Sequence, residues 1–350
     1  MSVVSAELRD FLEHYIPLIE QELFSYLPVQ EPAEFMYVPM RDYPERGGKR
    51  SRPALVLLAC QALGGDVHTA IRTATAFEMF QSFAVVHDDI EDDSDLRRGS
   101  PCIHKLIGTP LSINVGDALY AKVFEMLCDN RETLGAEKTL ELIQQMTLGS
   151  RETFEGQAYD VGWIRQRYVP TEAEFMTMLG KKTGWYTGRG PCTAGAIIAG
   201  CSAEQRRAIG EFGEAMAIAF QIRDDLLNLL STEEDEGKAP GVIGGAYGKE
   251  RGGDIAEGKR TLIIIDLLEK CAPAEREQIL AILHSDRCDT SQKDIDRVID
   301  MAQDYGAVAY AEETGKRKAD ESLAHLELLP AGPSRDRLRE MLEFFVRRAF

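Results

Sequence analysis

Apolar residues return every three or four positions over long stretches of this chain, as at Leu8, Leu12, Tyr15, Ile19 and Leu23. That period places the apolar side chains on one face of an α-helix, whereas the period-two alternation of a half-buried strand is almost absent. The pattern predicts helices near residues 5–27, 52–63, 67–93, 110–130, 135–161, 183–200, 203–231, 260–270, 291–305, 307–329 and 334–349. We therefore expect an all-α protein.

Several of the predicted helices are apolar nearly all round and rich in small residues, notably Pro53–Leu63 and Thr193–Gly200. Such helices are typical of positions buried among other helices. The breakers fall between the helices: the early prolines 28, 32, 39 and 44, the polar run 94–101, and the glycine-crowded stretch 237–258. No low-complexity linker divides the chain, so residues 1–350 are expected to form one large helical bundle around a central cavity.

Composition excludes several classes of function. The 350 residues are 44% hydrophobic and 28% charged, which is typical of a soluble globular chain with a large core. The formal net charge of -18 opposes general attraction to nucleic acid or an anionic membrane. No apolar run approaches the roughly 18 residues of a spanning helix, so we expect no stable membrane insertion. Seven scattered cysteines indicate a reducing compartment, and we expect the cytoplasm.

A strongly apolar helix is predicted to end in the acidic run HDDIEDD, residues 87–93. Asp88 and Asp92 are four residues apart, so on a helix their carboxylates share a face and repel each other unless a cation lies between them. Mg²⁺ accepts a few carboxylates and completes its coordination with water and phosphate oxygens. The run indicates either a metal site or, in the plainer interpretation, a solvated helix end.

A second cluster, QIRDDLLN at residues 221–228, follows a helix face of small apolar residues. Asp224 and Asn228 share a face, and the amide in place of a second carboxylate predicts weaker metal binding than at the first cluster. Alone, this cluster is equally compatible with a surface helix. Two such clusters in one bundle favour the opposed walls of a cavity that holds a diphosphate through bridging Mg²⁺ ions.

Basic residues are concentrated in four short runs that also contain glycine. They are GGKRSR at 47–52, RRG at 97–99, KKTG at 181–184, and GKERGGD at 248–254 continuing to GKR at 258–260. Glycine lets a loop close over phosphates, and lysines act there as point charges. Each run alone could be a solvated turn. Together they supply the local cations that a phosphate-bearing substrate needs in an acidic protein.

Over about residues 40–270 the chain resembles the trans-isoprenyl diphosphate synthases of the polyprenyl synthetase family, and among them the geranylgeranyl diphosphate synthases. The matching stretches are, in order, GGKRSRP, HDDIEDDSDLRRGSPCIH, GDAL, GQAYD, KKTG, FQIRDDLLN and GKERGGDIAEGKRTL. Their order and spacing are highly specific, although each piece alone is not. The resemblance implies an all-α homodimer in which two aspartate-rich motifs face each other across Mg²⁺ and an allylic diphosphate.

The resemblance also implies how the substrate's charge is handled. Asp88 and Asp92 would bind two metal ions and Asp224 a third, about three Mg²⁺ in all, with Mn²⁺ as an alternative. Arg97, Lys182 and Lys259 would draw charge onto the allylic diphosphate until its C–O bond ionises. Supporting contacts to the metals or to this diphosphate are implied for Asp89, Thr183, Gln221, Asp225, Asn228 and Lys249.

Isopentenyl diphosphate is the implied second substrate, held by Lys49, Arg52 and Arg98, and its double bond would attack the allylic cation. Many family members have His where Gln81 stands in this subsite, and Gln donates a hydrogen bond to phosphate without positive charge, which predicts lower affinity. Asn228 replaces the last Asp of the second motif, as in some geranylgeranyl-forming members, so activity is still expected. Lys249, ten residues before Lys259, fits the family spacing better than Lys238.

The family resemblance implies that product length is set by a residue beneath the first motif. Phe83 lies five positions before Asp88, with Ala84 beside it. An aromatic floor predicts early termination, and the resemblance implies a C20 product, geranylgeranyl diphosphate, made from C5–C15 primers. Farnesyl (C15) and farnesylgeranyl (C25) products stay open, as does a Phe83 that is only a core residue.

Two other functions occur on the same fold. A class I terpene cyclase would cyclise the ionised substrate without a second one, but Asn228 and Thr232 stand where its second metal motif usually has Ser/Thr and Glu. A non-catalytic synthase subunit would be expected to lack the first acidic motif, which this chain keeps. The sequence therefore favours a condensing prenyltransferase.

Overall fold

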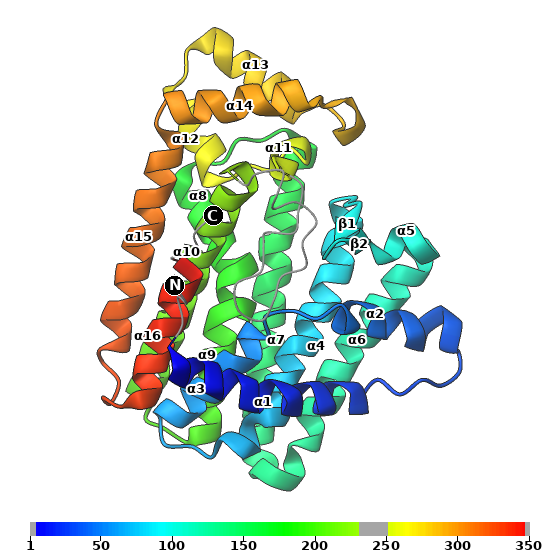
Figure 1. Cartoon of the computed structure of the whole chain (residues 1–350), viewed down its shortest axis with the longest axis vertical. Helices are drawn as coiled ribbons and strands as arrows, with labels where there is room; N and C mark the ends of the chain where they lie inside the picture. Colours follow the sequence, from blue (N-terminus) through cyan, green and yellow to red (C-terminus); the bar gives the residue numbers. More distant parts are fainter. Residues whose placement is uncertain (1–4, 231–250, 347–350) are drawn as a thin grey trace.

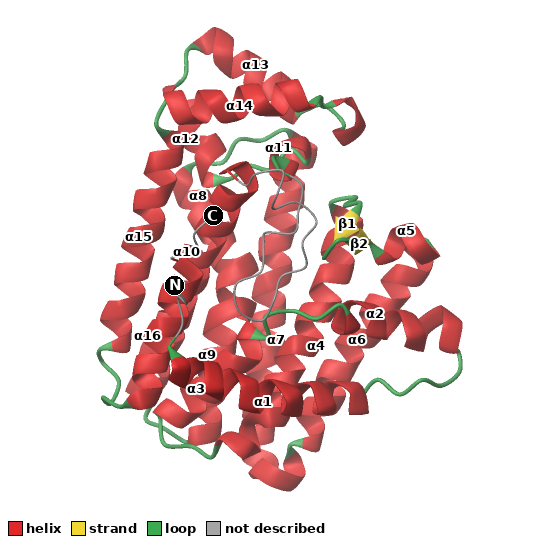
Figure 2. Ribbon diagram, viewed as in Figure 1, coloured by secondary structure: helices red, strands yellow, loops and turns green. Residues whose placement is uncertain are grey.

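The computed structural model describes residues 5–230 and 251–346, and their regular structure is almost entirely helical, as predicted (Figure 2). The α-helices are α1 (Ala6–Ser25), α2 (Val38–Glu45), α3 (Ser51–Ala62), α4 (Val67–Glu91), α5 (Ile103–Ile107), α6 (Thr109–Asp129), α7 (Arg131–Gln166), α8 (Glu172–Leu179), α9 (Gly190–Ala199), α10 (Ala203–Leu230), α11 (Gly253–Ala256), α12 (Leu262–Lys270), α13 (Pro273–Leu283), α14 (Gln292–Asp304), α15 (Ala307–Leu326) and α16 (Pro333–Val346). The π-helices η1 (Ala33–Tyr37) and η2 (Gly180–Arg189), the 3-10 helix η4 (Arg287–Asp289), and the strands β1 (Leu96–Arg97) and β2 (Ser100–Pro101) complete the described elements.

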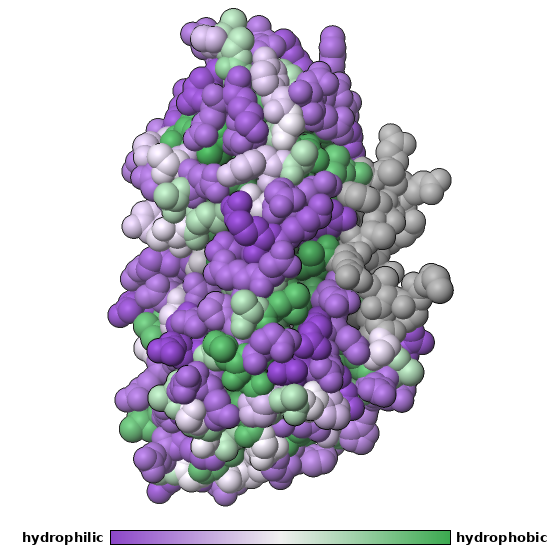
Figure 3. Space-filling view, turned by 90° about the vertical axis from the view of Figure 1, so that its left-hand side faces the viewer, coloured by the Kyte–Doolittle hydropathy of each residue, from purple (hydrophilic) through white to green (hydrophobic). Residues whose placement is uncertain are grey.

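The long helices α4, α6, α7, α10 and α15 run along the long axis of the molecule, and α1 lies across them (Figure 1). The pair α13 and α14 covers one end. Helix α4 packs against α3 and α6, and α10 packs against η2 and α15. No helix in the described residues is long and apolar enough to cross a membrane. The face on the α15 side is mostly hydrophilic, with apolar areas interrupting it near the middle (Figure 3).

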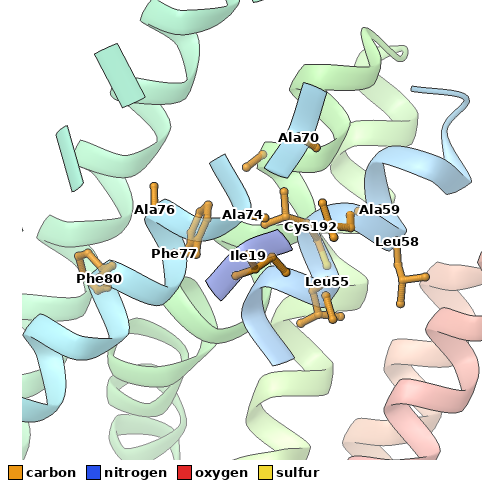
Figure 4. Packing of buried hydrophobic residues seen from close by; sticks show 14 of the residues in the cluster. Ile19, Leu55, Leu58, Ala59, Ala70, Ala74, Ala76, Phe77, Phe80 and Cys192 are labelled. Atoms are coloured by element: carbon orange, nitrogen blue, oxygen red, sulfur yellow. The ribbon is translucent and has the colours of Figure 1, made fainter. Parts of the chain in front are cut away.

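The buried apolar side chains form two clusters. The larger one joins α1, α3, α4 and α9, where Ile19, Leu55, Phe77 and Cys192 meet (Figure 4). The second contains residues of α8, α10 and α12–α15. Helix α10 contributes to both, since Phe212 belongs to the first cluster and residues 222 and 226 to the second. Helix α10 therefore runs from one cluster into the other.

Several helices that the sequence pattern missed have local signals. The early prolines predict breaks in helical structure, but Pro39 lies in the first turn of α2, where its missing N–H is not needed. Helix α8 begins with a capping box between Thr171 and Glu174, a signature that is readable from sequence. Helix α13 begins with Pro273, a residue favoured at the first position of a helix.

The predicted α-helix at 183–200 is wrong in its first half, because residues 180–189 form the π-helix η2 and only 190–199 are α-helical. The backbones of η2 and α7 touch here: a Cβ added at Gly156 would lie 2.2 Å from the backbone nitrogen of Lys182. Single π-turns are often found at functional sites. The close approach brings Lys182 beside α7.

The polar run 94–101 forms a two-residue hairpin in which Leu96 pairs with Pro101 and Arg97 with Ser100. Its turn residues, Arg98 and Gly99, both have positive φ, at 55° and 74°. Positive φ at both central positions matches the twist of a tight hairpin. The reversal directs Arg97 toward α4 and Arg98 toward the loop at Gly47.

Candidate active site

One cavity of about 870 Å³ collects most of the residues predicted to carry chemistry. Its walls come from α3, α4, α6, α7, α8, η2, α10 and the segment 254–261. Among the predicted residues, those that line it are Arg52, Gln81, Phe83, Ala84, Asp88, Arg97, Lys182, Thr183, Gln221, Asp224, Asp225 and Lys259. Both acidic clusters and all four basic runs therefore contribute to one cavity.

The carboxylates of the first acidic cluster are paired with the chain's own cations. Asp88 lies 3.4 Å from Arg97 Nη2 and 3.6 Å from Lys182 Nζ. Asp92 Oδ2 lies 2.7 Å from Lys259 Nζ. Burial raises the pKa of Asp92 to about 7 against the opposing charge of Lys259, and the nearby Asp88 carboxylate adds a smaller upward contribution. These carboxylates are thus in surroundings where added positive charge is favourable.

Asp89 orients Arg97 and does not line the cavity. Its side chain is fully buried, and Arg97 Nε donates to Asp89 Oδ1 at 2.9 Å. The hydroxyl of Tyr43 donates to the other oxygen of Asp89. Burial and this carboxylate raise the pKa of Tyr43 well above its usual value. Tyr43 and Asp89 therefore hold the guanidinium of Arg97 toward Asp88.

Residues of α7, a helix to which the sequence analysis gave no role, hold Lys182 in position. Asp160 Oδ2 accepts from Lys182 Nζ at 2.6 Å, and Gln157 Nε2 donates to Asp88 Oδ1 at 3.3 Å. Burial opposes the charge of Lys182, but the carboxylates of Asp160 and Asp88 outweigh it and raise its pKa. Gln157 and Asp160 are three residues apart in the GQAYD stretch, the spacing of neighbours on one helix face, which was the available signal.

The second acidic cluster meets a carboxylate that the sequence analysis did not select. Asp254, from α11, lines the cavity with Asp224 and Asp225. Burial and the Asp254 carboxylate raise the pKa of Asp225 to about 8, although Gln221 donates a hydrogen bond to it at 2.9 Å. This wall, like the first, holds buried carboxylates that an added cation would stabilise.

Asn228 does not lie where the sequence analysis expected it, among the groups that contact the allylic diphosphate. It is 1% exposed and lies outside the cavity lining. Its Oδ1 accepts from the backbone N–H of Asp254 at 3.2 Å, and its backbone oxygen accepts from Gly252 at 2.8 Å. Helix α11, which periodicity did not reveal, covers this side chain. Asn228 therefore anchors the turn that carries Asp254.

The other predicted basic residues differ in whether they line the cavity. Arg52 lines the cavity, where its Nη2 donates to Thr187 Oγ1 at 2.7 Å and its guanidinium lies 4.5 Å from the ring centre of Tyr186. Lys49 is partly exposed, and neither it nor Arg98 lines the cavity. Lys249 and Lys238 lie outside the described residues.

Phe83 is part of an aromatic group at one end of the cavity. Its ring lies 4.8 Å from that of Tyr120 and 5.8 Å from that of Phe154, and those two rings are 5.7 Å apart. All three side chains line the cavity. Tyr120 on α6 and Phe154 on α7 were missed because only helix packing, and no local sequence pattern, brings them beneath α4.

The donor set suits a hard divalent cation. Asp88 and Asp224 offer carboxylate oxygens to the cavity, and Asp92, which is not part of the lining, pairs with Lys259, which is. Within residues 5–230 and 251–346, no three His, Cys, Asp or Glu side chains converge closely enough to hold an ion by themselves. Carboxylate oxygens suit Mg²⁺, which uses one or two carboxylates with substrate phosphates and water.

Comparison with known proteins agrees with this chemistry, because residues 33–302 match the family model for polyprenyl synthetase. The chain belongs to the polyprenyl synthetase family. It is a prenyltransferase, and the predicted family and all-α fold are confirmed.

The similarity to individual polyprenyl synthetases extends over most of the chain. It is 35% identical over 302 residues to the short chain isoprenyl diphosphate synthase of Methanothermobacter thermautotrophicus, covering 86% of this chain and 87% of that one. The geranylgeranyl pyrophosphate synthetase of Pyrococcus horikoshii superposes with a TM-score of 0.87 at 32% identity, covering 98% and 99%. The geranylgeranyl pyrophosphate synthase of Corynebacterium glutamicum, solved with isoprenyl diphosphate and magnesium, gives 0.85 at 26%, covering 97% and 99%.

Proposed function

We propose that this polyprenyl synthetase condenses isopentenyl diphosphate with C5–C15 allylic diphosphates and releases geranylgeranyl diphosphate (C20). The observation that carries the proposal is the meeting of Asp88, Asp224, Lys182 and Lys259 in one cavity with an aromatic end. Acidic walls, cations and an apolar end together match a substrate with a charged head and a hydrocarbon tail. The names of the similar Pyrococcus horikoshii and Corynebacterium glutamicum proteins support the C20 product.

The head of the allylic substrate is proposed to lie between the two acidic walls. When bound there by Asp88, Asp92 and Asp224, about three Mg²⁺ ions, or Mn²⁺ in their place, would neutralise the diphosphate and promote departure of the leaving group. Arg97, Lys182 and Lys259 would contact the same diphosphate and stabilise the charge that develops on it. Asp89 and Asp160 hold Arg97 and Lys182 in position for that contact.

Isopentenyl diphosphate is proposed to bind beside Arg52 and Gln81. Arg52 Nε and Gln81 Oε1 are buried without a hydrogen-bond partner in this structure, and both residues line the cavity. A diphosphate would give the Arg52 donor an acceptor, and Lys49 at the start of the same loop would add charge. The double bond then attacks the allylic cation, and the proton lost afterwards passes to the released diphosphate.

The aromatic end of the cavity is proposed to stop elongation at C20. Phe83 and Tyr120 both line the cavity, with 4.8 Å between their ring centres. A growing prenyl chain would meet Phe83 first and Tyr120 next. Ala84 beside Phe83 adds little bulk, which leaves the aromatic rings as the limiting groups.

The homodimer is a further part of the proposal. Helices α6 and α7 expose the apolar side chains of Ile113, Leu140, Leu148 and Phe154 by 44%, 56%, 36% and 43%. Exposed apolar groups gathered on neighbouring helices are typical of a protein interface. Phe154 also lines the cavity, so a second copy placed there would cover its aromatic end. All seven cysteines are free thiols, which is compatible with the proposed cytoplasmic location.

The proposal is tested by incorporation of labelled isopentenyl diphosphate into acid-labile or extractable product, with and without an allylic primer and a divalent metal. We expect incorporation only when both are present. Hydrocarbon formed from a C15 or C20 diphosphate alone would favour a terpene cyclase. No incorporation with any primer, but recovery on adding a second subunit, would favour a non-catalytic role.

A further inference from the structure

The loop that carries Lys49 and Arg52 is held from beneath by Arg50. Arg50 immediately precedes α3 and has a left-handed backbone, with φ 48° and ψ 34°, which few residues other than glycine adopt. Its side chain is buried, with 2% of the residue exposed, whereas Lys49 and Arg52 are partly exposed. The left-handed turn thus sends Arg50 into the protein and leaves its cationic neighbours toward the solvent and the cavity.

Every nitrogen of the Arg50 guanidinium donates a hydrogen bond. Nη1 donates to Glu78 Oε1 on α4 at 2.7 Å, and Nη2 donates to the backbone oxygen of Pro44 on α2 at 2.9 Å. Nε and Nη2 both reach Glu20 Oε1 on α1, at 3.3 and 3.2 Å. One side chain therefore ties the loop to α1, α2 and α4. Burial opposes its charge, but Glu78 and Glu20 outweigh that effect and raise the pKa of Arg50.

Glu78 connects this anchor to the cavity wall. Its side chain is 4% exposed and lies three residues before Gln81 on α4, about one helical turn away. The loop is also held from the other side by Arg98, whose Nη1 donates to the Tyr43 backbone oxygen at 2.7 Å. The same Nη1 donates to the backbone oxygen of Gly47, and a Cβ at Gly48 would lie 3.0 Å from Arg98 Nη2, so the Arg98 guanidinium lies directly against the loop.

Glu78 also balances several neighbouring positive charges. Burial lowers the pKa of Arg98 to about 10; Glu78 opposes this shift, whereas the charges of Arg50, Arg97 and Arg52 add to it. Four arginines thus lie close enough to influence one another, and Glu78 pairs directly with one of them. Removing the Glu78 charge would leave Arg50 buried without its nearest counter-ion. It would also increase the repulsion among the four arginines.

We propose that Arg50 and Glu78 are positioning residues for the isopentenyl diphosphate subsite. Their buried pair fixes Lys49 and Arg52 relative to Gln81, because the carboxylate and Gln81 belong to the same helix. The inference rests on the proposed function, which places isopentenyl diphosphate at these residues. The allylic subsite depends on Lys182 and Lys259, which come from other elements, so loosening the pair affects the two substrates differently.

Two variants separate positioning from simple stability. Glu78→Gln leaves the buried Arg50 charge with only the half-exposed Glu20 as counter-ion, so we expect a lower melting temperature and a less precisely held loop. The double variant Arg50→Met/Glu78→Gln removes both charges, a change that is often neutral for stability, but it does not restore the bonds to Pro44 and Glu20. We expect both variants to raise the KM for isopentenyl diphosphate about tenfold, because small displacements of a positioning group have effects of this order or larger. The KM for the allylic substrate is expected to stay near the wild-type value.

Asp266→Asn is the matched control. Asp266 is a mostly buried carboxylate on α12, 2.7 Å from Lys270, outside the loop and the cavity lining. The Asp266→Asn substitution is expected to lower the melting temperature and to leave both KM values unchanged. The inference is overturned if the double variant regains stability and a wild-type KM for isopentenyl diphosphate, or if the two KM values rise together. A wild-type protein that does not use isopentenyl diphosphate would overturn the proposed function as well.

Discussion

Lys259 and Asp92, which are 167 positions apart in the chain, form an ion pair with 2.7 Å between Nζ and Oδ2. The proposed catalytic state assigns them different partners, a diphosphate for the lysine and a metal for the carboxylate. The pair therefore keeps two buried charges compensated until substrate and metal replace it.

The first prediction concerns Lys259→Gln. Loss of the lysine leaves the buried Asp92 without its nearest cation, so the free protein should melt at a lower temperature. Mg²⁺ with inorganic diphosphate should raise the melting temperature of the variant more than that of the wild type, because metal replaces the missing charge. We expect kcat to fall about 10²–10³-fold, the usual effect of removing one charge-stabilising group. Lys181→Gln, which removes pairs to Glu152 and Glu155 at the protein surface, is the control. Equal ligand-induced shifts in variant and wild type would contradict the account.

The second prediction concerns product length. Phe83→Ala removes the ring that first meets the growing chain, so products longer than C20 should appear. The ring of Tyr120 lies 4.8 Å from that of Phe83 and also lines the cavity, so Phe83→Ala/Tyr120→Ala should lengthen the products further. Phe124→Leu is the control, because Phe124 packs on Tyr120 at 5.2 Å without lining the cavity. Chromatography of the dephosphorylated products measures the distribution, and an unchanged pattern in the double variant would remove the aromatic floor from the account.

The third prediction concerns the contact between α7 and η2. In Gly156→Ala the new methyl carbon would lie 2.2 Å from the Lys182 backbone nitrogen, so the two helices must separate. We expect lower thermal stability and a lower kcat, because Lys182 moves away from Asp88. Gly149→Ala on the same helix meets only Trp185 at 3.6 Å, an ordinary contact, and should keep wild-type activity. Comparable kcat values in the two variants would show that the close approach is not needed.

The sequence reveals residues whose partners are local more readily than residues placed by packing. Asp88 and Asp92 could be paired from their spacing alone, since four residues make one helical turn. The family resemblance brought Lys182 and Lys259 to the same site, and the cavity lining agrees. Asp160, Asp254 and Tyr120 were missed because their roles depend on which helices pack together.

The helices α11 and η2 were not predicted correctly for a similar reason. Asn228 was assigned to the cavity by its spacing from Asp224, but the short helix α11 covers it, and no periodicity extends over its four residues. The π-helix η2 was predicted as α-helical because its apolar pattern is compatible with both. Its geometry depends on contact with α7, which a sequence window does not contain.

A fourth prediction concerns pH. Burial and the charges of Arg260 and Arg167 lower the pKa of His284, so the folded protein resists protonating it. As the pH falls below about 6.5, the unfolded chain binds more protons at this residue and stability is lost. Between about pH 7.5 and 5.5 the melting temperature of His284→Gln should therefore fall by less than that of the wild type. Parallel curves for the two proteins would contradict this assignment.

The most direct test of the central claim is product analysis of the purified wild-type protein. It would be incubated with Mg²⁺, labelled isopentenyl diphosphate and, separately, C5, C10 and C15 allylic diphosphates, followed by chromatography of the dephosphorylated products. The account predicts that each primer is elongated mainly to the C20 alcohol. Products that end at C15, continue well beyond C20, or are cyclic hydrocarbons formed without isopentenyl diphosphate would contradict it.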